Sequence, residues 1–429
     1  MFDFTSFFAD RLDALHREHR YRRFRTLERE PCAFPRAYWR SDSGQRHEVV
    51  VWCSNDYLGM SQHEVVRDAA RKAIDRFGNG AGGTRNISGT HSLLVELERE
   101  LADLHGRGGA LVFSSGYVAN DTTLATLGRL LPGCVFFSDA GNHASMIEGM
   151  RRSGARCQVF AHNDAGALDV ALAQTDPRLP RIVAIESLYS MGGDIAPLQQ
   201  LVAVARAHSA LIFIDETHAV GVHGPEGAGL VAAAGLSKEV DIVQGGLGKG
   251  YGVVGGFVTA SATLIDFIRS HAPGFIFTTA LPPSIAASAL ASVRHLRDSS
   301  IERQQLLERV DEVRDLLSHL QLTTVKGDSQ ILPWIIGDPV RCERIAEQLL
   351  LQYGIYLQPI NSPTVPQGTE RLRITPTPLH TPGMIERLAG ALAHCAAAPS
   401  IRTQALPLIE PGTLAREKHI RRHNVTELG

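Results

Sequence analysis

The chain has 429 residues, of which 44% are hydrophobic and 21% charged, a composition ordinary for a globular protein. Its 43 basic and 45 acidic side chains give a formal net charge of −2, which offers no electrostatic basis for binding nucleic acid or an anionic membrane. No stretch approaches the ~18 apolar residues of a membrane span, and no apolar signal segment opens the chain. Six cysteines without a CxxC pair or metal-ligand spacing fit reduced thiols in a cytoplasmic protein without a metal site.

The N-terminal region predicts a helix followed by an extended arm. Phe and Leu side chains between residues 4 and 15 recur on one helical face, which favours a docking helix. The run HRYRRF follows and contains Arg22. The run VVVWCSNDYLGM then predicts a strand that ends in a loop at Asn55. By itself SNDYLG indicates no more than this transition.

Two glycine-bearing segments come next. The run GNGAGGTRNISGT contains Thr84 and Asn86 and precedes an amphipathic helix over residues 93–104. The run GALVFSSGYVAND predicts a strand, a Ser-Gly turn and a helix. The backbone N–H groups of such a turn point at an anion, and the helix dipole adds to the attraction. A lone SSG is a weak signal, but it makes Ser115, Gly116 and Tyr117 candidates for binding a phosphate.

Strands and helices then alternate along the chain. One predicted strand is followed by a loop with His143, and Ser138 lies near its end; another is followed by a loop with Ser190. This alternation predicts a mostly parallel, doubly wound sheet. In such sheets ligands bind at the carboxyl ends of the strands, where these side chains fall. A lone histidine is nevertheless more often structural than functional.

The strongest chemical signal is a pair of strand ends. The run ALIFIDETHAVG places Asp215 at the end of an apolar strand, with His218 three residues later. The run DIVQGGLGKGYGVVGG predicts a short buried strand and a glycine-rich turn that holds Lys249. A glycine-flanked lysine alone is more often a solvated loop residue. Together with the aspartate, it suggests a Schiff-base lysine and an acid that holds a pyridinium nitrogen.

The pattern changes near residue 291. A long amphipathic helix is followed by short strands and two further helices, which predict a smaller α/β domain carrying Thr364 and Arg373. We therefore expect an N-terminal helix and arm over 1–50, a large cofactor-binding domain over 51–290 and a small domain over 291–398. Residues 399–429 form a basic tail to which we assign no function.

Taken together, these motifs resemble the α-oxoamine synthases, which are fold-type-I pyridoxal-phosphate enzymes, and within them the 5-aminolevulinate synthase branch. The resemblance runs from about residue 20 to about residue 381. Its most specific parts are TRNISGT (84–90), NHASMIEG (142–149) and NSPTVPQGTERLRITPTP (361–378). It implies an α/β fold with a large doubly wound domain and a smaller C-terminal domain.

The resemblance implies pyridoxal 5′-phosphate as the cofactor. Lys249 would hold it as an imine and later act as a general base, while Asp215 would keep its ring nitrogen protonated. His143 would stack on the ring, and His218 would bind the ring oxygen. Further cofactor contacts would come from Ser115, Gly116, Tyr117, Ser190 and position 246, and from Thr278 and Thr279 of a neighbouring subunit. The last two imply a homodimer with shared active sites.

The reaction implied is the condensation of glycine with succinyl-CoA, with loss of coenzyme A and CO₂, to give 5-aminolevulinate for tetrapyrrole biosynthesis. Arg22 and Asn86 would hold the succinyl carboxylate, since a planar guanidinium suits a carboxylate. Thr84 would restrict the amino acid to glycine, and Arg373 would bind its carboxylate. Asn55, Ser138 and Thr364 would be further substrate contacts.

Four positions depart from the family pattern. Gly246 replaces a threonine that reaches the phosphate, Gly192 an acid, Cys157 a lysine and Leu94 a histidine. They leave two alternatives open: a related α-oxoamine synthase with another acyl donor or amino acid, and a silent subunit that pairs with an active homologue. An aminotransferase is compatible with the fold alone, but the acyl-CoA motifs argue against it.

Overall fold

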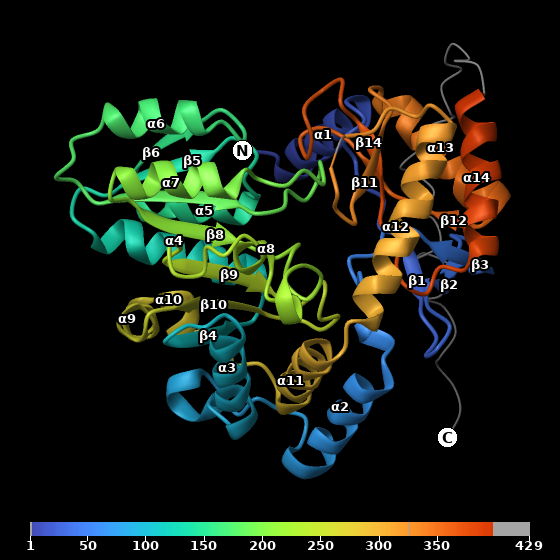
Figure 1. Cartoon of the computed structure of the whole chain (residues 1–429). Helices are drawn as coiled ribbons and strands as arrows, with labels where there is room; N and C mark the ends of the chain where they lie inside the picture. Colours follow the sequence, from blue (N-terminus) through green and yellow to red (C-terminus); the bar gives the residue numbers. More distant parts are fainter. Residues whose placement is uncertain (1, 326, 398–429) are drawn as a thin grey trace. The chain divides into compact units, whose positions relative to one another are not determined.

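A seven-stranded sheet in the order β4-β10-β9-β8-β7-β5-β6 organises the larger part of the fold (Figure 1). Strands β9, β8, β7, β5 and β6 run parallel, and β10 runs antiparallel to both β9 and β4. The predicted mostly parallel sheet is confirmed. The strands are β4 (Gly109–Phe113), β5 (Val135–Asp139), β6 (Arg156–Phe160), β7 (Arg181–Glu186), β8 (Leu211–Asp215), β9 (Ile242–Gly246) and β10 (Gly256–Ala260).

The structure is a computed structural model that describes residues 2–325 and 327–397. The predicted basic tail, 399–429, lies outside the described residues. Within them, no helix is long and apolar enough to cross a lipid bilayer.

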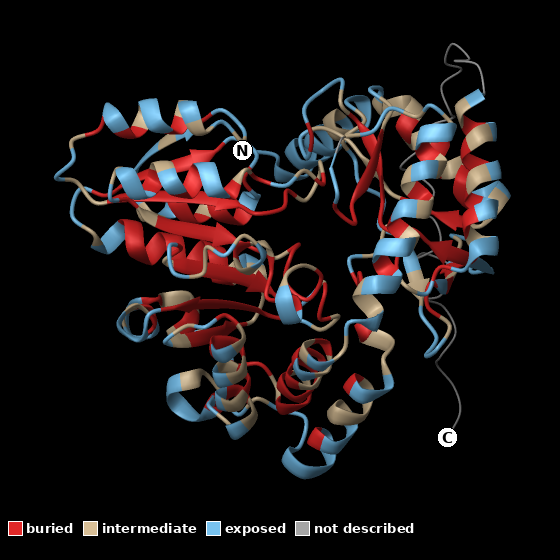
Figure 2. Cartoon of the chain, viewed as in Figure 1, coloured by how far each residue is buried: buried red, intermediate tan, exposed pale blue. Residues whose placement is uncertain are grey.

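Alternate side chains of the central strands pack on opposite faces, as the two-residue period of a strand requires. Phe136 and Phe213 belong to one hydrophobic cluster, whereas Phe137 and Ile212 belong to another. The first cluster includes side chains of α4 (Gly116–Leu130), α5 (Ala144–Ser153), α9 (Ala262–His271) and α10 (Pro273–Ile276). The second includes α6 (Ala165–Ala173) and α7 (Leu198–Ala207). Figure 2 shows these strands as buried.

Two smaller sheets accompany the large one. An antiparallel sheet has the order β11-β14-β13, and a second sheet has the order β1-β2-β3-β12. Because β12 pairs with β3, the N-terminal arm and the later part of the chain share one sheet. The strands are β1 (Thr26–Glu28), β2 (Arg36–Arg40), β3 (Arg46–Val51), β11 (Leu332–Ile335), β12 (Ile355–Tyr356), β13 (Pro359–Ile360) and β14 (Arg371–Ile374).

The remaining helices include α11, which runs through the boundary expected at residue 290, so the division into a large and a small domain stays a prediction. The helix α1 is present as expected, but none of its residues is buried within the chain. The helices are α1 (Phe4–Arg17), η1 (Met60–Gln62), α2 (Glu64–Phe77), η2 (Arg85–Gly89), α3 (Ser92–Leu104), η3 (Pro225–Gly227), α8 (Leu230–Ala233), α11 (Pro283–Asp298), α12 (Ile301–His319), α13 (Pro339–Tyr353) and α14 (Pro382–Ala397).

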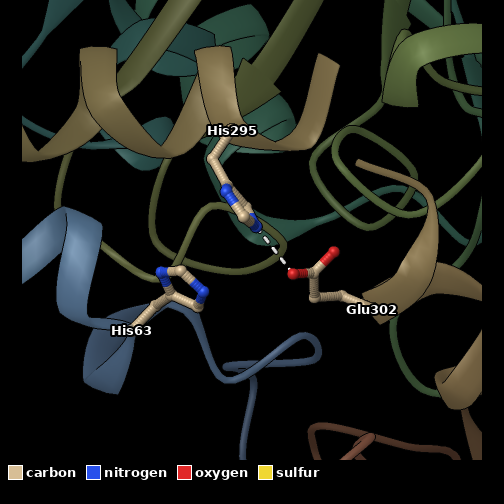
Figure 3. Close-up of side chains that lie close together, drawn as sticks. All are labelled: His63, His295 and Glu302. Atoms are coloured by element: carbon tan, nitrogen blue, oxygen red, sulfur yellow. Dashed lines mark hydrogen bonds and ion pairs between the residues drawn. The ribbon is translucent and has the colours of Figure 1, made fainter. Parts of the chain in front are cut away.

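A contact between two histidines and a glutamate joins α11 to α12 (Figure 3). His295 Nε2 lies 2.6 Å from Glu302 Oε1, and the rings of His63 and His295 lie 4.3 Å apart. Burial lowers the pKa of His63 below its ordinary value, so this ring is neutral at pH 7. Their potential ligand atoms lie within 4.8 Å of one another. In the described part of the chain, the three side chains make no hydrogen bond to Lys249 or Asp215.

Candidate active site

Lys249 lies in the glycine-rich turn that follows β9, as predicted. Its Nζ is 2.5 Å from Nε2 of His218, which lies just beyond the end of β8. The two strands are parallel neighbours in the sheet, so their carboxyl ends bring both side chains to the same edge. The structure therefore brings together the amine and the imidazole that the sequence singled out.

A chain of hydrogen bonds leads from Arg373 to the amine. Arg373 Nη2 donates to the hydroxyl of Tyr57 at 2.6 Å, and that hydroxyl lies 2.7 Å from Nδ1 of His218. If the tyrosine donates to Nδ1, the other ring nitrogen carries the proton and donates to Lys249. A hydrogen bond of this kind requires the lone pair of an uncharged amine.

The environment favours that uncharged form. Burial lowers the pKa of Lys249 to about 8; Asp215 and Glu186 oppose this shift, whereas Arg373 adds to it. Burial also holds the pKa of His218 well below its ordinary range, helped by Lys249 and Arg373. His218 is therefore neutral, and the unprotonated, nucleophilic form of Lys249 is a minor fraction at pH 7 but a much larger one than for an ordinary lysine.

Asp215 is fixed at the end of β8 by two donors. Asn120 Nδ2 donates to Oδ2 at 2.6 Å, and the backbone N–H of Thr217 donates to Oδ1 at 2.8 Å. Asn120 also donates to Ser145 Oγ at 3.0 Å, which lies 2.7 Å from Nδ1 of His143. The acid and His143 are thus held by one network, and both belong to the same region as Lys249.

Glu186 ends β7 directly beside Asp215 in the sheet register. Its side chain is buried, and burial, reinforced by Asp215, raises its pKa well above the ordinary range. Its protonated form is therefore favoured, which limits the negative charge beside Asp215.

The start of α4 has the geometry of an anion site. Ser115 caps the helix by accepting a hydrogen bond from the N–H of Val118 at 3.1 Å. A Cβ added to Gly256 of β10 would lie 2.5 Å from both Cα and N of Gly116, so β10 passes directly against this turn. A close backbone approach of this kind and a capped helix N-terminus suit a phosphate. With the amine of Lys249 and the carboxylate of Asp215, the residues present fit pyridoxal phosphate.

On the substrate side, Arg373 has further partners. Its Nη1 donates to Asn55 Oδ1 at 2.8 Å, and its Nε donates to the carbonyl of Ser190 at 2.7 Å. Arg22 Nη2 donates to Thr364 Oγ1 at 2.8 Å, although the two residues are far apart in the sequence. Four predicted site residues are thereby paired: Arg373 with Asn55, and Arg22 with Thr364.

Two further predicted residues, Thr84 and Thr279, lie together. Thr84 pairs with Thr279 in an isolated β-bridge, and the N–H of Ala280 donates to the carbonyl of Gly83 at 3.0 Å. Asn86 and Thr278 lie close to this bridge in the sequence. Nearby Ile87 and Phe277 are each 77% exposed. Thr278 and Thr279 line a small pocket together with Ser114, the residue before the helix cap Ser115, so the two threonines lie near the start of α4.

The remaining predicted positions have local partners. Ser138 is buried, and its hydroxyl accepts from Asn142 Nδ2 at 2.9 Å. Tyr117 is about half exposed and lies edge-on to the ring of His143. Among the departures, Leu94 is buried in the hydrophobic core and Cys157 is exposed on β6. Leu94 thus acts as a packing residue.

Tyr57, Asn120 and Glu186 were missed by the sequence analysis. Tyr57 lies in SNDYLG, where Asn55 was the candidate residue. Asn120 lies in SSGYVAND, where Ser115, Gly116 and Tyr117 were the candidates. Glu186 ends a strand in the same way as Asp215, and this signal was available in the sequence.

The loop that carries Ser190 is held by a partly exposed ion pair. His162 lies 2.7 Å from Asp139 through Nδ1 and 2.7 Å from Asp194 through Nε2. Hydrogen bonds to the two carboxylates raise the pKa of His162 to about 10. A Cβ at Gly192 would lie 2.0 Å from Oδ1 of Asp194, so the missing acid leaves room for this arrangement.

The sheet order, the aspartate that ends β8 and the lysine after β9 define a fold-type-I pyridoxal-phosphate-dependent transferase. The family model of class I and II aminotransferases matches residues 47–392. Within that broad family, the chain belongs to the 5-aminolevulinate synthases.

Two relatives illustrate the similarity. 5-Aminolevulinate synthase of Rhizobium meliloti (strain 1021) is 52% identical over 403 residues, covering 93% of this chain and 100% of that protein. The synthase of Bradyrhizobium diazoefficiens is 50% identical over 390 residues, covering 91% of this chain and 95% of that protein.

Solved structures of related enzymes have a similar fold. A serine palmitoyltransferase variant from S. paucimobilis, with PLP and myriocin bound, superposes with a TM-score of 0.85 at 31% identity, covering 92% of this chain and 98% of that chain. An 8-amino-7-oxononanoate synthase from Francisella tularensis has a TM-score of 0.69 at 24% identity, covering 81% of this chain and 97% of that chain, and supports the fold alone.

The lowered pKa of Lys249 predicts how the protein reacts with an aldehyde. The rate of covalent capture of pyridoxal 5′-phosphate should rise as pH increases through about 8, because only the unprotonated amine attacks. Visible absorbance measures the rate, and borohydride reduction with peptide mass analysis locates the label. Lys249→Ala should abolish the signal, whereas Lys238→Ala, at an exposed lysine, should retain it. Labelling of any other lysine would contradict the assignment.

His162 predicts a pH-dependent contribution to stability. Because its folded-state pKa is raised from 6.5 to about 10, the contribution is complete below about pH 6.5 and is lost as pH rises through about 10. His162→Gln should lower the free energy of unfolding by about 1–2 kcal/mol near pH 6, a value reduced for screening of a ring that is 40% exposed.

Urea unfolding at several pH values tests this prediction. The difference between the wild type and His162→Gln should shrink steadily between about pH 6.5 and 10. The matched control is His208→Gln, since His208 pairs with the single exposed carboxylate of Asp169. A difference that stays constant with pH would show that His162 contributes by packing.

Proposed function

We propose that this protein condenses glycine with succinyl-CoA to give 5-aminolevulinate, coenzyme A and CO₂. The observation that carries the proposal is the contact between Lys249 and His218, which holds an amine of lowered pKa near Asp215 in a chain of this family. Bound pyridoxal 5′-phosphate would supply an electron sink for a carbanion at the α-carbon of glycine.

The residues of this chain have distinct roles in the proposal. Lys249 would hold the cofactor through its aldehyde and, when its amine is free, would act as the base toward the proton on the α-carbon of glycine. Asp215, fixed by Asn120 and the N–H of Thr217, pairs with the ring nitrogen. His143 covers the ring, and His218 binds the ring oxygen. Ser115, Gly116 and Tyr117 bind the phosphate at the start of α4.

Arg373 is the proposed ligand of the glycine carboxylate. Its guanidinium is buried and already directed by Asn55, Tyr57 and the carbonyl of Ser190, so little ordering is required on binding. The α-carbon then attacks the thioester carbonyl, the thiolate of coenzyme A leaves with a proton, and the resulting β-keto acid loses CO₂. Ser138 is a further proposed substrate contact.

The acyl side of the proposal depends on Arg22 and its partner Thr364. Their hydrogen bond brings a cation from the N-terminal arm to the segment before β14. Arg22, together with Asn86, is proposed to bind the free carboxylate of the succinyl group, and Thr84 to exclude amino acids larger than glycine.

We also propose a homodimer with shared active sites, working in the cytoplasm, where its six free cysteines stay reduced. The exposed apolar side chains of Ile87 and Phe277, which neighbour Asn86 and Thr278 in the sequence, support the dimer, because a second copy would cover them.

Free-thiol release with glycine and a panel of acyl-CoA thioesters tests the reaction. Succinyl-CoA should be turned over fastest. Turnover with another acyl-CoA but not with succinyl-CoA would instead identify a related α-oxoamine synthase. A homodimer that neither captures the cofactor nor releases thiol would support the silent-subunit alternative.

Replacing Arg22 should weaken the use of succinyl-CoA selectively among acyl-CoA substrates. Arg22→Leu should raise KM for succinyl-CoA by about 10–100-fold, because a charge-assisted hydrogen bond to its carboxylate is lost. KM for an acyl-CoA without that carboxylate should not rise. The matched control is the adjacent Arg23→Leu, which removes an exposed cation of the same type. Equal losses with both acyl-CoA substrates would show that Arg22 contributes to folding and not to recognition of the carboxylate.

Mixed dimers test whether active sites are shared. One partner carries Lys249→Ala and the other carries Asn86→Ala, Thr278→Ala and Thr279→Ala. A shared arrangement leaves one of the two sites of each mixed dimer intact, so random mixing should restore about a quarter of wild-type activity. Each variant alone should be inactive or nearly so. If each chain contained its whole site, mixing would restore nothing.

A further inference from the structure

The end of β9 lacks a side chain where the family pattern has a threonine. Gly246 is the last residue of the strand and is buried. A Cβ built there would lie 2.6 Å from Cγ2 and 3.3 Å from Oγ1 of Thr217, closer to the methyl group than real Cβ atoms come. The volume beside Gly246 is therefore already filled by Thr217.

Thr217 reaches this volume from the neighbouring strand. It follows Asp215 by two residues, and its backbone N–H donates to Oδ1 of that acid at 2.8 Å. Its side chain extends toward the start of α4: Oγ1 lies 3.7 Å from the position a Cβ would take at Gly116. One residue thus holds the acid through its backbone and presents a hydroxyl at the proposed phosphate site.

The hydroxyl has a defined orientation. Thr217 Oγ1 donates to Oε1 of Gln244 at 3.0 Å, and the amide group of Gln244 is fixed because its Nε2 donates to the carbonyl of Gly245 at 2.9 Å. A hydroxyl rotates about its C–O bond at little cost, so the proton is free to turn from Gln244 to a phosphate oxygen.

We propose that the Thr217 hydroxyl binds the cofactor phosphate at the start of α4, in place of the side chain that Gly246 lacks. This inference rests on the proposed binding of pyridoxal phosphate. The phosphate-binding hydroxyl is displaced from the end of β9 to the end of β8, and glycine at position 246 is the condition that makes room for it. Thr217 is then a determinant of selectivity for the phosphorylated form of the cofactor.

The test compares ligands with and without the phosphate. The full chain is freed of cofactor, and its dissociation constants for pyridoxal 5′-phosphate and pyridoxal are measured by absorbance. Thr217→Val keeps the shape but removes the hydroxyl, and should weaken binding of the phosphorylated form about 10–100-fold. Binding of pyridoxal should stay within about twofold, since the backbone contact to Asp215 remains. Thr217→Ser, which keeps the hydroxyl, should bind both ligands like the wild type.

A second variant tests the same inference independently of any folding defect in Thr217→Val. In Thr217→Ala/Gly246→Thr the smaller alanine vacates the space occupied by the methyl group, and the new threonine returns a hydroxyl from β9. It should bind pyridoxal 5′-phosphate more tightly than Thr217→Ala alone by at least about fivefold.

Other outcomes distinguish a failure of the role of Thr217 from a failure of cofactor binding. Equal weakening for both ligands, or no weakening in Thr217→Val, would overturn the role of Thr217 while leaving the cofactor in place. A wild-type chain that captures neither ligand would overturn the proposed function and this inference with it.

Discussion

The hydrogen bond between Lys249 and His218 is the contact on which the site depends. Burial shifts an amine toward its uncharged form, whose lone pair can accept a hydrogen bond from a donor. His218 is that donor only if Nδ1 accepts from Tyr57, whose hydroxyl in turn accepts from Arg373. The protonation state of the lysine is therefore linked, through two intermediate side chains, to the arginine proposed to bind the substrate carboxylate. The protonation of Lys249 and the hydrogen bonding of Arg373 therefore depend on each other.

A second constraint is the close approach of backbones at the start of α4. The contacts of Gly116 with Gly256, and of Gly246 with Thr217, leave no volume for additional side chains. Close approach exposes backbone N–H groups to an anion, and it makes every nearby substitution a question of volume as well as of chemistry. This explains why a change at the end of one strand has a counterpart at the end of its neighbour.

The sequence was sufficient for the sheet and for the strand ends that carry the candidate residues. Alternation of strands and helices predicted the parallel sheet, and Asp215, His218 and Lys249 were found because they follow apolar strands. Tyr57 was not found because its role arises only from its contact with His218, 161 positions away, which no local pattern encodes. Thr84 and Thr279 were singled out individually, but only the structure shows that they pair with each other across 195 positions of the sequence.

The departures from the family pattern illustrate the same limit. From the sequence, Gly246 is a lost hydroxyl, with a cost to cofactor affinity of about 1.5–3 kcal/mol. The coordinates place the hydroxyl of Thr217 beside that position, where it approaches the start of α4. The residue type at position 246 alone therefore understates which phosphate-binding groups the site retains. If a donor in a small volume is what has to be preserved, a hydroxyl at the end of β8 can replace one at the end of β9, since the two strands are neighbours in the sheet.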